Sequence, residues 1–286
     1  MVGAPKTGTT SLYSYLYQFD DIYMSMVKEP NYFAVATVPD NSYLQPIRDT
    51  TRYLRLFAKG AHCKYRGEAS PTYLLDGCAP GLIKELSPNA RIIISIRDPV
   101  DTAYSFYLMQ KRKGRISCTF ADAVRDRIFR VPLDWSVPQL RLEFAFYSQS
   151  IEKYFEVFGK ERVFISVFEE MRANTKGTIE RIACFLDLPE PPSTGNREIY
   201  NMAGAPRSAL AQKIMQNQIL TRFGETLFRP PLRRKIKKIF IKPVPKPALE
   251  PEAREMLVEL YAEDVHQVRE LLGRQLPWPN FVAGNY

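Results

Sequence analysis

The first residues of the chain combine residue types that bind a phosphate-like anion. Residues 3–10 read Gly-Ala-Pro-Lys-Thr-Gly-Thr-Thr and lead directly into a helical pattern. The backbone N–H groups of such a loop, the positive helix end and a lysine form a cradle for an anion. The alternative is a chance glycine-rich turn. The candidate ligands in this loop are Lys6, Thr7, Gly8, Thr9 and Thr10.

This loop differs from the nucleotide-binding loop Gly-x-x-x-x-Gly-Lys-Ser/Thr, which it partly matches. The spacing of Gly3 and Gly8 is the same. However, Thr9 occupies the position of the motif's lysine, and Lys6 lies inside the loop instead. A P-loop nucleotide kinase or NTPase would need that lysine and an acidic partner for Mg²⁺ at a strand end, and the sequence offers neither.

A second anion site is predicted around Arg97, which directly follows the apolar run at residues 91–96. Open parallel sheets bind ligands at the carboxyl ends of their strands. Ser105 lies eight residues later, two turns into the next predicted helix, so its hydroxyl can face the same side. A guanidinium with a nearby hydroxyl suits a separate phosphate. The alternative is a surface ion pair between Arg97 and Asp98 or Asp101.

The elements that must position these residues follow an α/β pattern. Apolar runs at residues 91–96, 162–168 and 63–67 predict strands, and amphipathic helical stripes alternate with them. We therefore predict a central parallel sheet flanked by helices, in a single domain spanning residues 1–286. The helical stripes lie at Leu12–Leu16–Phe19, Phe120–Val124–Ile128, residues 144–158 as one long helix, and residues 256–272.

Composition excludes several classes of protein. Hydrophobic residues make up 45% and charged residues 25% of the 286 residues, as in an ordinary soluble globular protein. We expect no signal peptide, and no apolar run in the sequence reaches the ~18–20 residues that cross a bilayer. Four separated cysteines and two histidines disfavour a metal site and fit reduced thiols. We expect a cytoplasmic protein whose chemistry needs no metal.

Two features of the sequence are unusual. Only Met1 and Val2 precede Gly3, so the first strand is shorter than the usual ~5–6 residues, and we expect strand residues upstream of Met1 in the natural reading frame. The second feature is a basic, proline-rich arm at residues 222–251. Nine basic residues against one acid within residues 222–246 carry most of the net charge of +9. Such an arm favours an anionic acceptor or a membrane surface, or it is a solvated surface. No nucleic-acid-binding motif accompanies it.

The two anion motifs, in their order and separation, resemble those of sulfotransferases that use 3′-phosphoadenosine 5′-phosphosulfate (PAPS). The loop resembles the 5′-phosphosulfate motif, and Arg97-Asp-Pro…Ser105 resembles the 3′-phosphate motif. Other segments are similar to the heparan-sulfate type of this family. They are Lys28-Glu-Pro-Asn-Tyr-Phe33, Gly67-Glu-Ala-Ser-Pro-Thr-Tyr73, residues 154–189 and Leu271-Leu-Gly-Arg-Gln-Leu-Pro-Trp278. The resemblance covers nearly the whole chain.

The resemblance implies a P-loop-like three-layer fold and transfer of a sulfuryl group from PAPS to an acceptor hydroxyl, or to an amine. Lys6 and the amides of Gly8 to Thr10 would stabilise charge on the leaving 5′-phosphate. Arg97 and Ser105 would bind the 3′-phosphate, and Glu29 would take the acceptor's proton. His62 is the chemical rival for that role, although it precedes the strand at residues 63–67, at the end away from the ligand edge.

The sequence also departs from the family pattern. Ala69 occupies a position where family members often carry a lysine, so one substrate-side cation is missing. The late Lys-Gly-Arg loop is absent as such, and Arg207 is the candidate to replace its arginine. The paired cysteines and membrane anchor of the Golgi enzymes are absent as well, which favours a cytoplasmic bacterial-type member. A glycan, a lipid and a small metabolite all stay open as acceptors, and a non-catalytic phosphonucleotide-binding module stays open as an alternative function.

Overall fold

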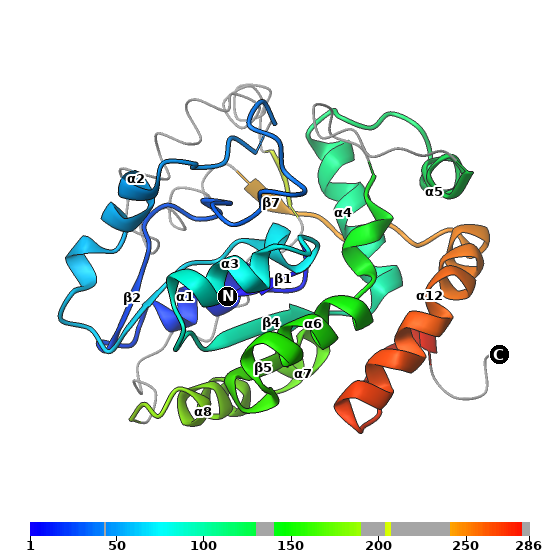
Figure 1. Ribbon diagram of the computed structural model, residues 1–286. Helices are drawn as coiled ribbons and strands as arrows, with labels where there is room; N and C mark the ends of the chain where they lie inside the picture. Colours follow the sequence, from blue (N-terminus) through cyan, green and yellow to red (C-terminus); the bar gives the residue numbers. More distant parts are fainter. Residues whose placement is uncertain (43, 130–139, 190–203, 207–240, 282–286) are drawn as a thin grey trace.

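Figure 1 shows the computed structural model of the protein, which describes residues 1–42, 44–129, 140–189, 204–206 and 241–281. A parallel sheet of strand order β1-β4-β5 lies at its centre. Its strands are β1 (Val2–Gly3), β4 (Ile92–Ile96) and β5 (Val163–Val167). Val2 is in register with Ile94, and Ile94 with Ile165. The sequence predicted β4 and β5 within one residue of their observed bounds.

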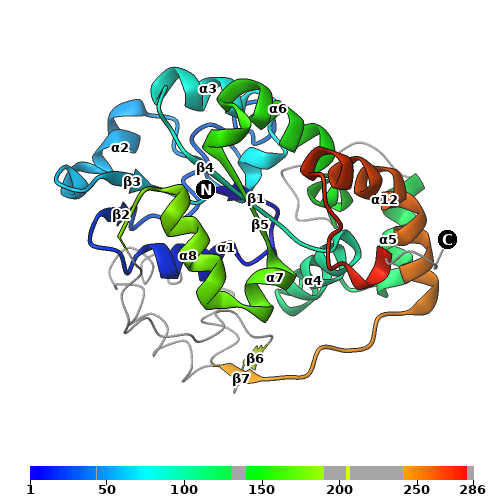
Figure 2. The ribbon, with the colours of Figure 1, turned by 90° about the horizontal axis from the view of Figure 1, so that it is seen from below.

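Helices cover both faces of this sheet, as Figure 2 shows. All five residues of β4 are buried, and alternate residues enter different core clusters. Ile94 belongs to a cluster shared with α3 (Ala79–Leu86) and α6 (Ser148–Phe158). Ile93 belongs to a cluster shared with α1 (Thr9–Leu16) and α8 (Thr175–Phe185). A central strand buried on both faces is typical of the predicted three-layer α/β fold.

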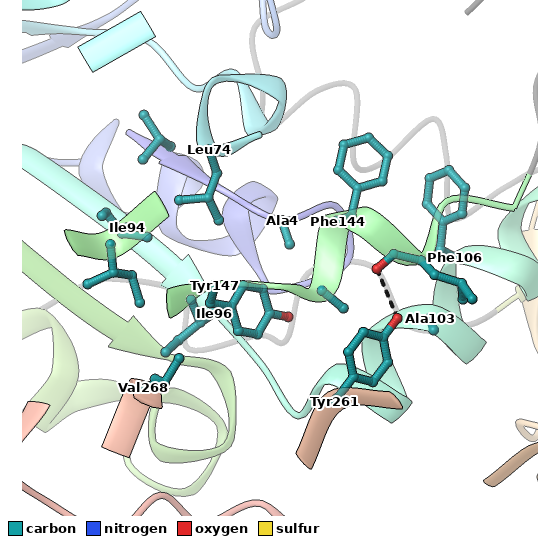
Figure 3. Close-up of a cluster of buried hydrophobic side chains, with 14 of the residues drawn as sticks. Ala4, Leu74, Ile94, Ile96, Ala103, Phe106, Phe144, Tyr147, Tyr261 and Val268 are labelled. Atoms are coloured by element: carbon teal, nitrogen blue, oxygen red, sulfur yellow. Dashed lines mark hydrogen bonds between the residues drawn. The ribbon is translucent and has the colours of Figure 1, made fainter. Parts of the chain in front are cut away.

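A further group of helices extends the first core cluster beyond the sheet. It contains α4 (Pro99–Arg112), α5 (Phe120–Phe129) and α12 (Pro251–Leu272). Figure 3 shows Ile96 of β4 and Phe106 of α4 within the same cluster as Tyr261 of α12. The buried Tyr261 hydroxyl donates a hydrogen bond to the Leu142 carbonyl at 2.9 Å. This packing fixes α4, which carries part of the second predicted anion site, to the end of β4.

The stripe at residues 144–158 is two helical segments, not the single helix that the spacing predicts. A short 3₁₀ turn, η3 (Leu142–Ala145), ends before the extended residue Phe146, and α6 begins at Ser148. The break is stabilised by Asp264, whose carboxylate accepts the backbone N–H groups of Tyr147 at 2.8 Å and Ser148 at 2.9 Å. Because Asp264 comes from α12, local spacing could not reveal this cap.

The weakest predicted strand belongs to a separate small sheet. β3 (Tyr65–Gly67) pairs in parallel with β2 (Ile22–Met24). The first helix ends at Leu16, so Phe19 packs in the core from the turn after it. The remaining elements are α2 (Thr50–Arg55), η1 (Ala58–Gly60), η2 (Pro71–Leu74), η4 (Lys160–Arg162), α7 (Phe168–Ala173), β6 (Gly204–Pro206), β7 (Ile241–Pro243) and η5 (Pro279–Phe281).

The structure describes the short first strand and part of the basic arm, the two unusual features of the sequence. The first strand is as short as predicted, and the buried amino group of Met1 donates to the Glu68 carbonyl at 2.8 Å. Within the basic, proline-rich arm, residues 241–243 form the strand β7, which pairs antiparallel with β6. Residues 222–240 of the arm lie outside the described residues. Within the described ranges, every helix is too short or too polar to cross a bilayer.

Candidate active site

The predicted anion loop connects β1 to α1 and contains two residues in the left-handed region. Lys6 has φ 74°, and Gly8 has φ 91° at the start of α1. A Cβ on Gly8 would lie 2.6 Å from Cε of Met171 and 2.9 Å from Cδ2 of Phe168. Only glycine combines this conformation with this close approach. The loop leads directly into the first turn of α1, where the first amides of an α-helix have no partner within the helix.

Two side-chain hydroxyls form hydrogen bonds with backbone carbonyls of this loop. The buried Thr7 hydroxyl donates to the Ala4 carbonyl at 2.7 Å. Ser95 at the end of β4 donates its hydroxyl to the Thr7 carbonyl at 2.6 Å. Of the predicted ligands, Thr7 would thus act through its backbone and not through its side chain. Thr9 is buried and Thr10 is half-buried at the start of the helix.

The structure brings the two predicted anion sites together. Arg97, which follows β4, donates from Nη1 to the carbonyl of Lys6 at 3.3 Å. Its own carbonyl accepts the hydroxyl of Tyr147 at 3.0 Å. Asp98 caps α4 by accepting the N–H groups of Val100 at 3.0 Å and Asp101 at 3.2 Å. Arg97 therefore lies between the loop and the first turn of α4.

Arg97 lies next to two acidic groups. Nη2 donates to Asp101 at 3.1 Å, so the surface-pair alternative for Arg97 is present as a contact. Nε lies 3.9 Å from a carboxylate oxygen of Glu169, too far for a hydrogen bond, and the guanidinium stacks 4.6 Å from the centre of the Phe168 ring. Burial raises the pKa of Glu169 to about 7. Sequence reasoning missed Glu169, because its contact with Arg97 joins two different strand ends.

Lys246 is a second residue that sequence reasoning did not assign to this site. Its Nζ donates to Asp101 at 2.7 Å and lies 4.8 Å from the ring centre of Tyr104. The Tyr104 hydroxyl in turn donates to the carbonyl of Pro247 at 3.1 Å. Ser105 is half-buried and follows Asp101 by one turn on the same helix face. The described end of the basic arm thus contributes a cation beside Arg97, where the sequence pointed only to an acceptor or a membrane.

Glu29 approaches the anion loop through its neighbour Lys28. The Nζ of Lys28 lies 2.7 Å from Oε1 of Glu29 and 3.0 Å from Oγ1 of Thr10. Glu29 is therefore paired with Lys28 in the structure. The Glu29 side chain is 40% exposed, so it is less desolvated than the role of a base requires before an acceptor covers it.

The backbone around Glu29 is held in an uncommon conformation. Glu29 and Asn31 have φ values of 58° and 52°. The N–H of Glu29 donates to the Ala69 carbonyl at 3.1 Å, and that of Asn31 donates to Oγ of Ser70 at 3.2 Å. Asn31 Nδ2 donates to the Glu29 carbonyl at 2.9 Å. The predicted Glu-x-Ser-Pro segment thus serves as the support of the predicted base.

A buried carboxyl group lies within that support. The Ser70 hydroxyl donates to Glu68 Oε2 at 2.8 Å, and the Tyr53 hydroxyl donates to Oε1 at 3.4 Å. Burial raises the pKa of Glu68. We assign Glu68 to holding residues 68–70 in place, because its oxygens are bound by neighbouring side chains.

Two other predicted residues lie elsewhere. His62 is exposed and precedes β3, whereas the carboxyl ends of β2 and β3 lead to the Glu29 and Glu68 segments. His62 is therefore at the opposite end of this small sheet, as the sequence predicted. Arg207 lies outside the described residues. Among the residues that the structure describes, no three His, Cys, Asp or Glu side chains group as metal ligands do.

Comparison with known proteins identifies the family. The family model described as the sulfotransferase domain matches residues 1–267. A sulfotransferase from Alicyclobacillus acidocaldarius has a similar structure, with a TM-score of 0.68 and 27% identity, covering 96% of this chain and 95% of that one. The chain belongs to the sulfotransferase domain family. The predicted fold and the predicted sulfotransferase family are thereby confirmed, and nothing in these comparisons favours the kinase alternative.

Curated relatives include enzymes named for carbohydrate substrates. Human carbohydrate sulfotransferase 15 is 25% identical over an alignment of 285 positions, and the match covers 76% of this chain and 50% of that protein. Human heparan sulfate glucosamine 3-O-sulfotransferase 6 is 26% identical over 189 residues, which cover 66% of this chain and 51% of that protein. The chain thus spans about half the length of the curated relatives that it matches.

Proposed function

We propose that this protein transfers the sulfuryl group of PAPS to a hydroxyl group of a carbohydrate. The observation that carries this proposal is the contact between Arg97 Nη1 and the Lys6 carbonyl at 3.3 Å. It joins an anion loop at a helix start to a second cationic site, so one ligand with two separate phosphate-bearing ends fits both. PAPS carries a phosphosulfate at its 5′ end and a phosphate at its 3′ position.

The anion loop would hold the 5′ end of the donor. Lys6 and the first-turn amides of α1 would bind the oxygens of the 5′-phosphate, with Thr9 and Thr10 as hydroxyl donors. In-line transfer shifts negative charge to the oxygen that leaves with this phosphate. Fixed N–H groups and an ammonium at that position stabilise the charge without reorganising during the reaction.

The cations around α4 would hold the 3′-phosphate. Arg97, Ser105 and Lys246 are the proposed ligands, and Asp101 is the group that the phosphate must displace. Asp101 pairs with both cations in the structure, at 3.1 Å from Arg97 and 2.7 Å from Lys246. A phosphate dianion with the same two partners would take over these charge-assisted hydrogen bonds.

Glu29 is the proposed general base. The acceptor oxygen attacks sulfur, the bond from sulfur to the 5′-phosphate oxygen breaks, and the acceptor proton passes to the Glu29 carboxylate. Support for this role comes from the Lys28 bridge, which connects Glu29 to Thr10 at the donor loop. His62 lies at the far end of the small sheet, which argues against it as the base.

The proposed acceptor class rests on the relatives. The names of the two relatives given above indicate carbohydrate substrates, and one of them is a 3-O-sulfotransferase by name. This favours a carbohydrate hydroxyl over a lipid, a small metabolite or an amine. The Ala69 position, next to the support of Glu29, lacks the lysine of many family members, so we expect a different charge pattern in the preferred carbohydrate.

A transfer assay with radiolabelled PAPS tests the function and the base together. The purified protein is incubated with [³⁵S]PAPS and a panel of defined oligosaccharides, lipids and phenols, and labelled products are separated. We expect label in an oligosaccharide. Glu29→Gln should lower kcat by roughly 10²–10⁴, the usual contribution of a positioned base, while His62→Asn changes it little. Transfer that survives Glu29→Gln and disappears with His62→Asn would reverse the two roles.

We also propose that the enzyme works in the cytoplasm. Cys63, Cys78, Cys118 and Cys184 are all free thiols, and the last three are exposed. Exposed unpaired thiols fit a reducing compartment. Fractionation of the native host followed by immunodetection should place the protein in the cytoplasmic fraction, and recovery from a membrane or secreted fraction would contradict this.

A further inference from the structure

Lys28 lies between the proposed base and the donor loop, and the proposed function assigns it no role of its own. Its ammonium contacts the proposed base and the donor loop at the same time, with Nζ 2.7 Å from Glu29 Oε1 and 3.0 Å from Thr10 Oγ1. The Lys28 side chain is 20% exposed, and that of Glu29 is 40% exposed. One cation therefore stands between the group expected to accept a proton and the loop expected to hold the sulfuryl donor.

Stability does not account for this arrangement. A partly exposed ion pair between neighbouring residues contributes little to folding. The backbone of the segment is instead held by Ala69 and Ser70, through the bonds to the N–H groups of Glu29 and Asn31. Two non-glycine residues keep positive φ values there, and such strain clusters at functional sites. The fold thus fixes the pair at the site without needing the ion pair itself.

In the structure the ammonium occupies one of the lone-pair sites of the Glu29 carboxylate, on Oε1. A Glu29 oxygen that accepts a hydrogen bond from Lys28 at 2.7 Å does not have that lone pair available for an acceptor proton. Thr10, the other partner of Lys28, is a proposed donor ligand at the start of α1. An anionic sulfuryl group bound there would present oxygens to Nζ that compete with Glu29.

We propose that Lys28 is a catalytic residue that responds to the donor: when PAPS binds, its ammonium exchanges the hydrogen bond to Glu29 for hydrogen bonds to the sulfuryl oxygens. The lone pair of Glu29 that Lys28 occupies in the structure then becomes available to the acceptor proton when PAPS is bound. This inference rests on the proposed function of the loop and of Glu29. Lys28 forms no covalent bond in the reaction. Sulfur exchanges its bond to the 5′-phosphate oxygen for one to the acceptor oxygen, the electron pair leaves with that phosphate, and the proton goes to Glu29.

The proposal separates PAPS from its product, 3′-phosphoadenosine 5′-phosphate (PAP), because only PAPS carries the sulfuryl group. Calorimetry without acceptor should show that Lys28→Met weakens PAPS binding about ten- to hundredfold, the range for a hydrogen bond to a charged group, with PAP unchanged. Lys28→Arg keeps the charge and should retain most of the PAPS affinity. Lys176→Met is the matched control, since Lys176 is an exposed lysine paired with Glu180 at 3.4 Å.

A double-mutant cycle tests the coupling to Glu29. Glu29→Gln removes the competing carboxylate charge, so it should tighten PAPS binding severalfold and leave PAP binding unchanged. This gain should vanish in the Lys28→Met background, because the two side chains then no longer share an interaction. Hydrolysis of [³⁵S]PAPS to sulfate, with water as the acceptor, gives the kinetic readout and should fall in Lys28→Met.

The outcomes distinguish this inference from the proposed function. If the wild-type protein binds neither PAPS nor PAP, the proposed function fails. If it binds both and Lys28→Met weakens them equally or not at all, the function stands and the role of Lys28 is overturned. Equal gains from Glu29→Gln with and without Lys28 would also overturn it. Thermal unfolding of Lys28→Arg and Lys28→Met checks that all variants are folded.

Discussion

The two halves of the proposed donor site are held in different ways. The anion loop between β1 and α1 is fixed by hydrogen bonds among its own backbone, Thr7 and Ser95. The second half, around Arg97 between β4 and α4, is held by opposite charges from Asp101 and Glu169. The first half offers N–H groups that are already oriented toward an anion. The second must exchange carboxylate partners for phosphate.

This difference predicts different sensitivities. Binding at the loop depends on backbone conformation, such as φ 91° at Gly8, and should respond little to pH. Binding at Arg97 depends on how strongly the carboxylates compete, and Glu169 has a pKa raised by burial to about 7. The loop should therefore govern the rate of transfer, and the Arg97 region should govern donor affinity and its dependence on pH.

The largest expected effect comes from the loop. Lys6→Ala removes a cation next to the leaving phosphate and should lower kcat by roughly 10²–10³, as the loss of one oxyanion donor does. The fold should be intact, because the loop is braced by Thr7 and Ser95. Turnover with [³⁵S]PAPS and thermal unfolding would measure both quantities. A variant within threefold of wild-type turnover would show that Lys6 is not at the reacting group.

An intermediate effect is expected from the described end of the basic arm. Lys246→Met removes a partly exposed cation beside Asp101, and PAP affinity should fall roughly tenfold. Calorimetry with PAP measures this.

The other basic residues of the arm should behave differently from Lys246. Neutralising them should raise the acceptor KM and leave PAP affinity unchanged, as the sequence predicts. The contrasting variant carries neutral residues at Arg233, Arg234, Lys235, Lys237 and Lys238. If this variant weakens PAP as much as Lys246→Met does, the arm acts on the donor as a whole and the division between its two ends is wrong.

The smallest expected effect concerns pH. Above about pH 7 Glu169 is ionised and competes with the 3′-phosphate for Arg97, so PAP affinity should fall severalfold relative to Glu169→Gln. Taking the ratio of wild-type to variant affinity one unit below and above this pH cancels the titration of PAP itself. If this ratio does not change with pH across this range, Glu169 does not compete with the 3′-phosphate for Arg97.

The same residue makes a prediction for stability. Because the folded pKa of about 7 lies above the ordinary value of 4.5, the fold favours the neutral form of Glu169. Its contribution to the free energy of unfolding is fully present below the ordinary value and is lost as pH rises toward 7. Wild type should therefore lose stability relative to Glu169→Gln across this window, as denaturant unfolding at several pH values would measure.

Much of the fold was readable from the sequence, because it depends on local patterns. The run before Arg97 predicted β4, and the glycine spacing predicted the loop at the start of α1. The break between η3 and α6 was missed because its cap, Asp264, lies on α12. Apolar periodicity records which face of a segment is buried, but it does not record a distant carboxylate that stabilises a helix start.

The candidate site shows the same limit. Arg97 could be predicted because it directly follows a buried strand. Glu29 could be predicted because the segment Lys28–Phe33 resembles a family motif. Lys246 and Glu169 reach Arg97 and its neighbour Asp101 only through contacts between residues far apart in the chain. The Lys28 bridge to Thr10 spans 18 residues and joins the loop after β2 to the first turn of α1. Charged side chains in such networks have no spacing rule, so only the folded arrangement reveals them.

The central claim is that one donor occupies both halves of the site. Calorimetry with PAP and with adenosine 5′-phosphate, which lacks the 3′-phosphate, tests it most directly. Wild type should bind PAP far more tightly than adenosine 5′-phosphate, and Arg97→Ala should abolish most of that difference. Arg162→Ala, which removes a half-buried arginine that donates to the Pro88 carbonyl, should preserve it. Equal affinity of the wild-type protein for the two nucleotides would contradict the claim.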